Sequence, residues 1–235
     1  MLRLILWDVD GTLIHTQGIG SEVFDRAFEQ VLGLAPSARI SERVRLSGKT
    51  DPQIAREYLE LMGITDPDAH LPLVLKILEA ELATAAATLA ANGGAFGGVA
   101  EVLARLAGTE GAYQTLLTGN LAANALVKVA AFGLDQWLDL EIGAYGSDHA
   151  DRCELVPIAR ERARRLRGVD AAPEDTWVVG DTERDLACAR AGGARCLLVA
   201  TGSTPLAELA ALGPDAVMAD LSDVDAVFDL LTAEG

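Results

Sequence analysis

Short apolar runs alternate with segments of helical spacing along most of this chain, and this alternation limits the fold more than any other feature. The apolar runs cover Leu2–Trp7, Tyr113–Thr118, Asp139–Ala144, Thr176–Gly180, Arg195–Ala200 and Ala216–Ala219. The helical patterns between them cover Val99–Leu106, Ala122–Phe132, Leu155–Leu166 and Asp185–Ala191. Short continuous apolar runs are typical of strands that are buried on both faces. Strands that alternate with helices predict an α/β fold built on a doubly wound parallel sheet.

One region interrupts the alternation, because residues 15–91 show helical patterns and no good strand. The expected helices are Ser21–Leu32, Asp51–Met62 and Pro72–Ala91. Asp51 and Pro52 are typical of an N-cap followed by proline at the first helical position. We therefore expect a core domain of residues 1–14 and 92–235 and an inserted all-helical cap domain of residues 15–91. Glycines flank the insertion on both sides, and they are equally compatible with hinges and with ordinary loops.

The charge balance excludes several classes of partner. The chain has 19 Lys and Arg against 35 Asp and Glu, which gives a formal net charge of −16. Nucleic acids and anionic membranes are bound mainly through Lys and Arg, so neither is expected as a partner. An anionic substrate would require a local cluster of positive charge.

The cysteines indicate a reducing compartment, and the apolar runs predict neither a signal peptide nor a membrane-spanning helix. Cys153, Cys188 and Cys196 form no CxxC pair, so free thiols are expected rather than disulfides or a zinc site. The N-terminal apolar run is too short for a signal peptide, and no apolar stretch approaches the roughly 20 residues that span a bilayer. We expect a cytoplasmic protein.

Two carboxylates follow the first predicted strand directly, in the segment Asp8-Val9-Asp10-Gly11-Thr12-Leu13. Ligands of open parallel sheets bind beyond the carboxyl ends of the strands. Two acidic side chains at such a place are compensated by a divalent cation, and their oxygen ligands suit Mg²⁺. A simple turn would also explain the pattern, whereas a calcium-binding EF-hand loop needs more acidic positions.

Two other predicted strands end in polar residues. Gly180 and Asp181 end one of them, and Asp185 follows in the first turn of the next helix, where a carboxylate is also favoured by the helix dipole. Thr118, Gly119 and Asn120 end the other. Thr118 alone would suit an N-cap, but a hydroxyl and backbone N–H groups at a helix start can also bind phosphate.

In this order and spacing, the three strand ends resemble the motifs of the haloacid dehalogenase superfamily. The resemblance extends over the whole chain and implies a Rossmann-like doubly wound core. The helical insertion, with Ser47-Gly48-Lys49-Thr50-Asp51, is similar to the cap of the phosphoglycolate phosphatase-like branch.

The resemblance implies a role for each matching residue. Asp8 would be the nucleophile that becomes an aspartyl phosphate, and Asp10 the acid and base. Thr118, together with Gly119 and Asn120, would bind the phosphoryl group. Mg²⁺ would be held by Asp8, Asp181 and the backbone carbonyl of Asp10, with Asp185 supporting the metal site.

The chain departs from the family pattern at one position. The family usually has a Lys near the helix that follows the third motif strand, and residues 146–157 contain none. Arg152 is the best match, because a guanidinium is always cationic and binds phosphate through paired hydrogen bonds. A solvated arginine near a helix start is the alternative. Lys49 and Arg45 of the cap are further candidates for substrate binding.

These residues predict a phosphatase that acts on a small phosphorylated metabolite. Asp10 favours cleavage of a phosphate ester, because the dehalogenase branch lacks this second aspartate. A phosphomutase acting on a sugar phosphate could carry the same motifs, and a catalytically silent binding protein could keep the fold. Other motifs fail: Gly48-Lys49-Thr50 lacks the first glycine of a P-loop, since Arg43 takes its place, and no GxSxG or GxGxxG occurs.

Overall fold

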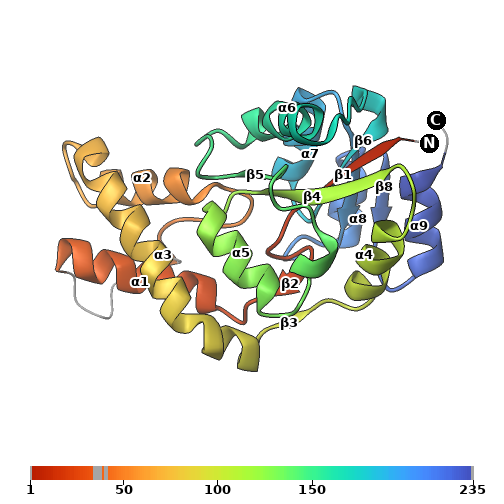
Figure 1. Cartoon of the computed structure of the whole chain (residues 1–235). Coiled ribbons are helices and arrows are strands. Elements are labelled where there is room, and N and C mark those ends of the chain that lie inside the picture. The colour runs from red at the N-terminus through yellow and green to blue at the C-terminus, as the bar shows by residue number, and fades with distance from the viewer. Residues whose placement is uncertain (1, 34–38, 40–41, 234–235) are drawn as a thin grey trace.

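A six-stranded parallel sheet forms the centre of the molecule in the computed structural model, which describes residues 2–33, 39 and 42–233. The strand order is β5-β4-β1-β6-β7-β8, so β1 lies in the middle and the chain winds outward in both directions (Figure 1). The strands are β1 (Arg3–Trp7), β4 (Ala112–Thr118), β5 (Ala144–Tyr145), β6 (Thr176–Gly180), β7 (Arg195–Val199) and β8 (Ala216–Met218). This arrangement confirms the predicted doubly wound α/β fold.

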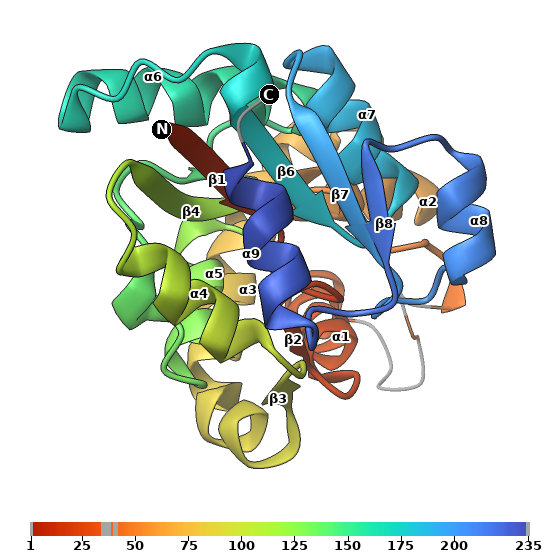
Figure 2. The ribbon, with the colours of Figure 1, turned by 90° about the vertical axis from the view of Figure 1, so that its right-hand side faces the viewer.

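Helices cover both faces of the sheet. Figure 2 shows α4 (Val99–Ala107) and α9 (Val224–Thr232) on one side, with α6 (Leu155–Arg167) and α7 (Glu183–Ala191) on the other. Side chains of β1 alternate between the two layers: Ile5 and Trp7 join the core under α4 and α9, whereas Leu4 and Leu6 join the core under α6 and α7. Burial on both faces explains why the strands are continuous apolar runs.

Some elements differ from the prediction. The expected strand Asp139–Ala144 is wrong for most of its length, because only Ala144 lies in β5. The backbone of Asp139 instead bonds to β4, where its N–H donates to Gln114 O and its carbonyl accepts from Thr115 Oγ1. Two helices had no counterpart in the prediction, α8 (Leu206–Ala211) and α9.

Three helices form a separate layer beside the sheet: α1 (Ile19–Leu32), α2 (Asp51–Leu61) and α3 (Pro67–Asn92). They pack around their own hydrophobic cluster, which includes Phe28, Tyr58 and Leu78. The chain leaves and re-enters the core through two short strands, β2 (Ile14–His15) and β3 (Gly94–Ala95), which pair antiparallel. We refer to this helical layer as the cap.

The start of α2 differs from the prediction in a way that matters for the site. Thr50, not Asp51, is the N-cap, and its Oγ1 accepts from the N–H of Gln53 at 3.2 Å. Asp51 is the first helical residue, and its Oδ2 accepts from the N–H of Leu121 in the core domain at 2.8 Å. The carboxylate therefore links the cap to the core instead of capping its own helix.

The described helices include none that combines the length and the apolar character needed to cross a membrane.

Candidate active site

The polar strand ends converge at the carboxyl edge of the sheet because β1 lies between β4 and β6. Asp8 follows β1, and its N–H donates to Val179 O of β6 at 2.9 Å. Thr118 ends β4, and Asp181 follows β6. Gly11 turns the chain over this edge with φ +84°, and a Cβ there would lie 2.5 Å from Asp181 Oδ2. Glycine is required because both the backbone angle and the space exclude a side chain.

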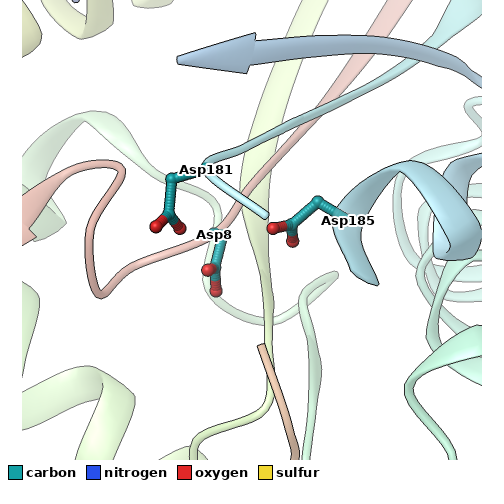
Figure 3. Close-up of side chains that lie close together, drawn as sticks. All are labelled: Asp8, Asp181 and Asp185. Atoms are coloured by element: carbon teal, nitrogen blue, oxygen red, sulfur yellow. The ribbon is translucent and has the colours of Figure 1, made fainter. Parts of the chain in front are cut away.

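Three buried carboxylates face one another at this edge. Asp8, Asp181 and Asp185 each place an oxygen within 4.8 Å of the others (Figure 3). Burial raises the pKa of Asp8 to about 6 and that of Asp181 to about 8, and the neighbouring carboxylates add to both shifts. Mutual repulsion and lost hydration are the conditions that a divalent cation relieves, so the donor set fits a hard metal ion such as Mg²⁺.

Asp185 differs from the other two because both of its oxygens already have protein partners. Oδ2 accepts from the N–H and the Oγ1 of Thr182, at 3.0 and 2.7 Å, and these bonds form part of a capping box at the start of α7. Oδ1 accepts from Arg152 Nη2 at 2.5 Å. Asp185 thus lies beside the other carboxylates and is held by Thr182 and Arg152.

Arg152 lies in the cluster, at the start of the 3₁₀ helix η3 (Arg152–Glu154). Its Nη2 is 3.0 Å from Asp8 Oδ1, and its side chain is only 6% exposed. Burial alone would lower the pKa of Arg152, but Asp185 and Asp8 raise it, so the guanidinium stays charged. Arg152 is therefore a buried cation that contacts the carboxylate of Asp8.

A second buried cation of the site is Lys128 of α5 (Ala122–Ala130), which the sequence motifs did not identify. Its Nζ lies 2.6 Å from Asp10 Oδ2 and 2.6 Å from Asn120 Oδ1. The amide of Asn120 donates to Asp10 Oδ2 at 2.7 Å and to Thr118 Oγ1 at 2.8 Å. The available signal was a lysine inside the apolar segment Ala125–Ala131, since buried lysines are rare unless paired.

A cavity of about 290 Å³ lies between these strand ends and the cap. Its core wall includes Asp8, Asp10, Thr118, Asn120 and Asp181. Its cap wall combines polar residues, among them Ser21, Ser47, Lys49 and Asp51, with six apolar side chains, those of Val23, Phe24, Leu46, Ile54, Leu78 and Leu82.

The two cap cations named by the sequence lie in different places. Lys49 lines the cavity, is 10% exposed and pairs with Glu57. Arg45 does not line the cavity; its side chain is 62% exposed and lies 3.9 Å from Glu183.

The cap segment at Lys49–Asp51 closes tightly on the core loop after β4. A Cβ at Gly119 would lie 2.1 Å from Lys49 O, so only glycine allows this approach. The N–H of Asp51 donates to Gly119 O at 2.7 Å, and Thr50 Oγ1 donates to Ala150 O at 2.6 Å. Gly119 thus lets the cap approach the phosphate-binding loop that the sequence predicts.

Comparisons with known proteins agree with this geometry. Residues 155–224 match the family model described as HAD-hydrolase-like. “Probable phosphatase IndB” of Dickeya dadantii (strain 3937) is 26% identical over 225 residues, which cover 95% of this chain and 92% of that protein.

Two solved structures have the same fold over almost the whole chain. A hydrolase from Pseudomonas syringae matches with a TM-score of 0.73 at 18% identity, covering 99% of this chain and 100% of the other. CbbY from Rhodobacter sphaeroides, solved with phosphate, matches with a TM-score of 0.70 at 21% identity, covering 95% and 96%.

The fold, the order of the motifs and the family match over residues 155–224 agree with a resemblance to the haloacid dehalogenase-like hydrolases. The resemblance stated from the three strand ends is confirmed.

Proposed function

We propose that the protein is a magnesium-dependent phosphatase that hydrolyses a small phosphate monoester through an aspartyl phosphate on Asp8. The proposal rests on the environment of Asp8. Its carboxylate lies against Arg152 and the carboxylates of Asp181 and Asp185, on the wall of a cavity that also contains Thr118 and Asp10. An ionised carboxylate is a competent nucleophile once its repulsion from an anionic substrate is offset.

The first half of the reaction transfers the phosphoryl group to Asp8. A bond forms between a carboxylate oxygen of Asp8 and phosphorus while the bond from phosphorus to the ester oxygen breaks. The carboxyl group of Asp10 gives its proton to the departing oxygen, so that the product leaves as a neutral alcohol. Such general acid catalysis is typically worth about 10² to 10⁴ in rate.

The second half returns the enzyme to its starting state. Asp10, now ionised, takes a proton from a water molecule whose oxygen attacks phosphorus. The bond between phosphorus and Asp8 breaks, and inorganic phosphate is released. Thr118, together with Gly119 and Asn120, would hold phosphoryl oxygens in both halves.

Asp8 and Asp181 would hold the Mg²⁺ together with the backbone carbonyl of Asp10, and Asp185 would support them. A bound divalent cation would supply positive charge that offsets the repulsion of the phosphoryl oxygens by Asp8. Arg152 keeps Asp8 ionised, because its charge lowers the pKa that burial raises.

The leaving group would occupy the cap side of the cavity. The apolar side chains of that wall favour a compact alcohol with carbon surface to bury. The name of the Dickeya relative and the phosphate held by CbbY support a phosphate-ester substrate.

The decisive experiment measures phosphate release from a panel of phosphate monoesters. We expect turnover with Mg²⁺, none after chelation, and a loss of about 10⁴ to 10⁶-fold in Asp8→Asn, because the nucleophile is removed. Asp170→Asn, which changes an exposed aspartate that does not line the cavity, is the matched control and should keep full activity. No release from any ester by the unaltered protein would refute the proposal, and so would full activity of Asp8→Asn.

A further inference from the structure

Lys128 is one of the most buried charged side chains of the cavity wall, with 7% of its side chain exposed. A lysine is rarely buried unless its charge is paired. Its partners are both residues of the cavity wall: Asp10 Oδ2 and Asn120 Oδ1 each lie 2.6 Å from Nζ. The burial of Lys128 therefore serves the site, not the hydrophobic core alone.

The helix that carries Lys128 is held from two sides. Ala125 and Val129 of α5 join the core under the sheet, whereas Val127 packs against the hydrophobic cluster of the cap. Asn124 and Lys128, four residues apart, share the polar face that lines the cavity. Packing on both sides fixes the backbone position of Lys128, from which its side chain reaches the loop after β1.

Asp10 has few restraints of its own. Its side chain is 40% exposed, in contrast to the 6% of Asp8. Among the described residues, Lys128 and Asn120 donate side-chain hydrogen bonds to its carboxylate, and both bonds reach the same oxygen, Oδ2. The other oxygen, Oδ1, accepts no side-chain hydrogen bond from the described residues and belongs to the wall where a leaving group would lie.

Asn120 extends the restraint to a second residue. Its Oδ1 accepts from Lys128 while its Nδ2 donates to Asp10 Oδ2 and to Thr118 Oγ1. An amide whose oxygen is fixed by a cation has its two donors fixed as well, because the group is planar. Lys128 thus orients Asp10 directly and Thr118 through Asn120.

The two buried cations of the cavity contact different carboxylates. Arg152 binds Asp8 and Asp185, on the side of the nucleophile. Lys128 binds Asp10, on the side of the leaving group.

We propose that Lys128 is a positioning residue that holds the carboxyl group of Asp10 where it can serve the oxygen of the leaving group. The inference rests on the proposed phosphatase reaction. Its effect is selective in the first half of the reaction: release of the ester oxygen as an alcohol depends on a correctly placed Asp10, and release of a weakly basic leaving group does not. The attack of water in the second half also uses Asp10, and this step is the same for every ester. A displacement of about 1 Å at a reacting group can reduce a rate by about 10²-fold.

The test compares two kinds of ester with Lys128→Met. Alkyl phosphates release a strongly basic alkoxide and need the proton of Asp10, whereas p-nitrophenyl phosphate releases a weakly basic phenolate and does not. We expect kcat/KM, which reports the steps up to formation of the aspartyl phosphate, to fall by about 10²-fold for alkyl phosphates and much less for the aryl ester. Lys128→Arg, which keeps the charge, should recover part of the alkyl activity.

The same measurement in the Asp10→Asn background tests whether Lys128 acts through Asp10. With Asp10 already replaced, Lys128→Met should leave the ratio of alkyl to aryl activity unchanged, since the two substitutions remove one function. Lys76→Met replaces an exposed lysine of α3 and is the matched control, with unchanged activity on both esters. Should Lys128→Met fail to fold, Lys128→Gln, which keeps a polar group of similar length, takes its place.

The outcomes separate this inference from the proposed function. An alkyl-to-aryl ratio in folded Lys128→Met or Lys128→Gln that equals that of the unaltered protein would overturn the positioning role while the phosphatase stands. Equal losses on both esters would do the same, because they indicate a general structural role. A phosphatase proposal that fails shows itself earlier, as an unaltered protein that releases no phosphate from either ester.

Discussion

The two walls of the cavity differ in chemistry and in how they are held together. The core wall presents carboxylates, a hydroxyl and an amide at strand ends, and buried ion pairs with Arg152 and Lys128 keep them in place. The cap wall has polar residues near Lys49 and, beyond them, six apolar side chains that also belong to, or pack against, the hydrophobic cluster of the cap.

From this difference we expect the core wall to determine the reaction and the cap wall to determine which esters bind. Buried charges are favourable only when paired in good geometry, so each acidic group of the core wall depends on particular partners. Apolar packing depends instead on shape and volume, and it tolerates gradual change. Substitutions in the core wall should therefore remove the chemistry, whereas substitutions in the cap wall should change which esters fit.

The largest effect after Asp8→Asn is expected for Arg152→Met. Removing the guanidinium leaves Asp8 and Asp185 without their cation, and loss of one such electrostatic group typically costs about 10² to 10³ in kcat. Because Arg152 lowers the pKa of Asp8, the acidic limb of the pH–rate profile should move to higher pH. Steady-state kinetics across pH with a good substrate would measure both effects.

Arg152→Lys is the conservative control for this prediction. It keeps the charge but loses the planar pair of donors, so an intermediate rate is expected. Wild-type activity in Arg152→Met would show that the core wall does not depend on this cation, and the contrast between the two walls would lose its basis.

A smaller effect is expected on the free energy of unfolding, which should depend on pH and on bound metal. The folded-state pKa values of Asp8 and Asp181, about 6 and about 8, lie above the usual 3.8. Between these limits the metal-free folded protein binds more protons than the unfolded chain, so its free energy of unfolding should fall as the pH rises from about 4 to about 8. A difference of one bound proton changes it by about 1.4 kcal/mol per pH unit.

Mg²⁺ should oppose this loss at neutral pH, by about 2.7 kcal/mol at one hundred times its dissociation constant. Denaturant unfolding with Mg²⁺ and with a chelator, at several pH values, would measure it. Asp181→Asn should be less sensitive to both pH and Mg²⁺, and Asp170→Asn should behave as the unaltered protein does. Equal stabilisation of Asp181→Asn by Mg²⁺ would place the ion elsewhere.

The smallest effect is expected in the cap wall, for Ile54→Val. Loss of one buried methylene typically costs about 0.5 to 1.5 kcal/mol of stability. The kcat for a small ester should not change, while KM for esters with a longer alkyl group should shift by roughly tenfold, because one methylene of pocket volume is altered. Kinetics with a series of alkyl phosphates would show it, and an equal loss of kcat on every ester would contradict the separation of the two walls.

Local patterns in the sequence were sufficient for most of the fold. Continuous apolar runs predicted β1, β4, β6, β7 and β8 to within a residue or two, since burial on both faces leaves a signal in the run itself. The run at 139–144 failed because the backbone of Asp139 is satisfied by β4 outside the regular ladder. The pattern could not show this, because apolar residues in an irregular buried segment resemble a strand.

The sequence by itself also determined which carboxylates end neighbouring strands, because Asp8 and Asp10 follow the apolar run Leu2–Trp7 and Asp181 follows the run Thr176–Gly180. Only the tertiary structure decided which cations face them. Lys128 is 118 residues from Asp10, and Arg152 is 33 residues from Asp185. Asp51 appeared to be a local helix cap, yet its carboxylate binds Leu121, 70 residues away. Periodicity and capping record the neighbours of a residue along the chain, whereas an ion pair depends on distances that exist only after the sheet and the cap have packed.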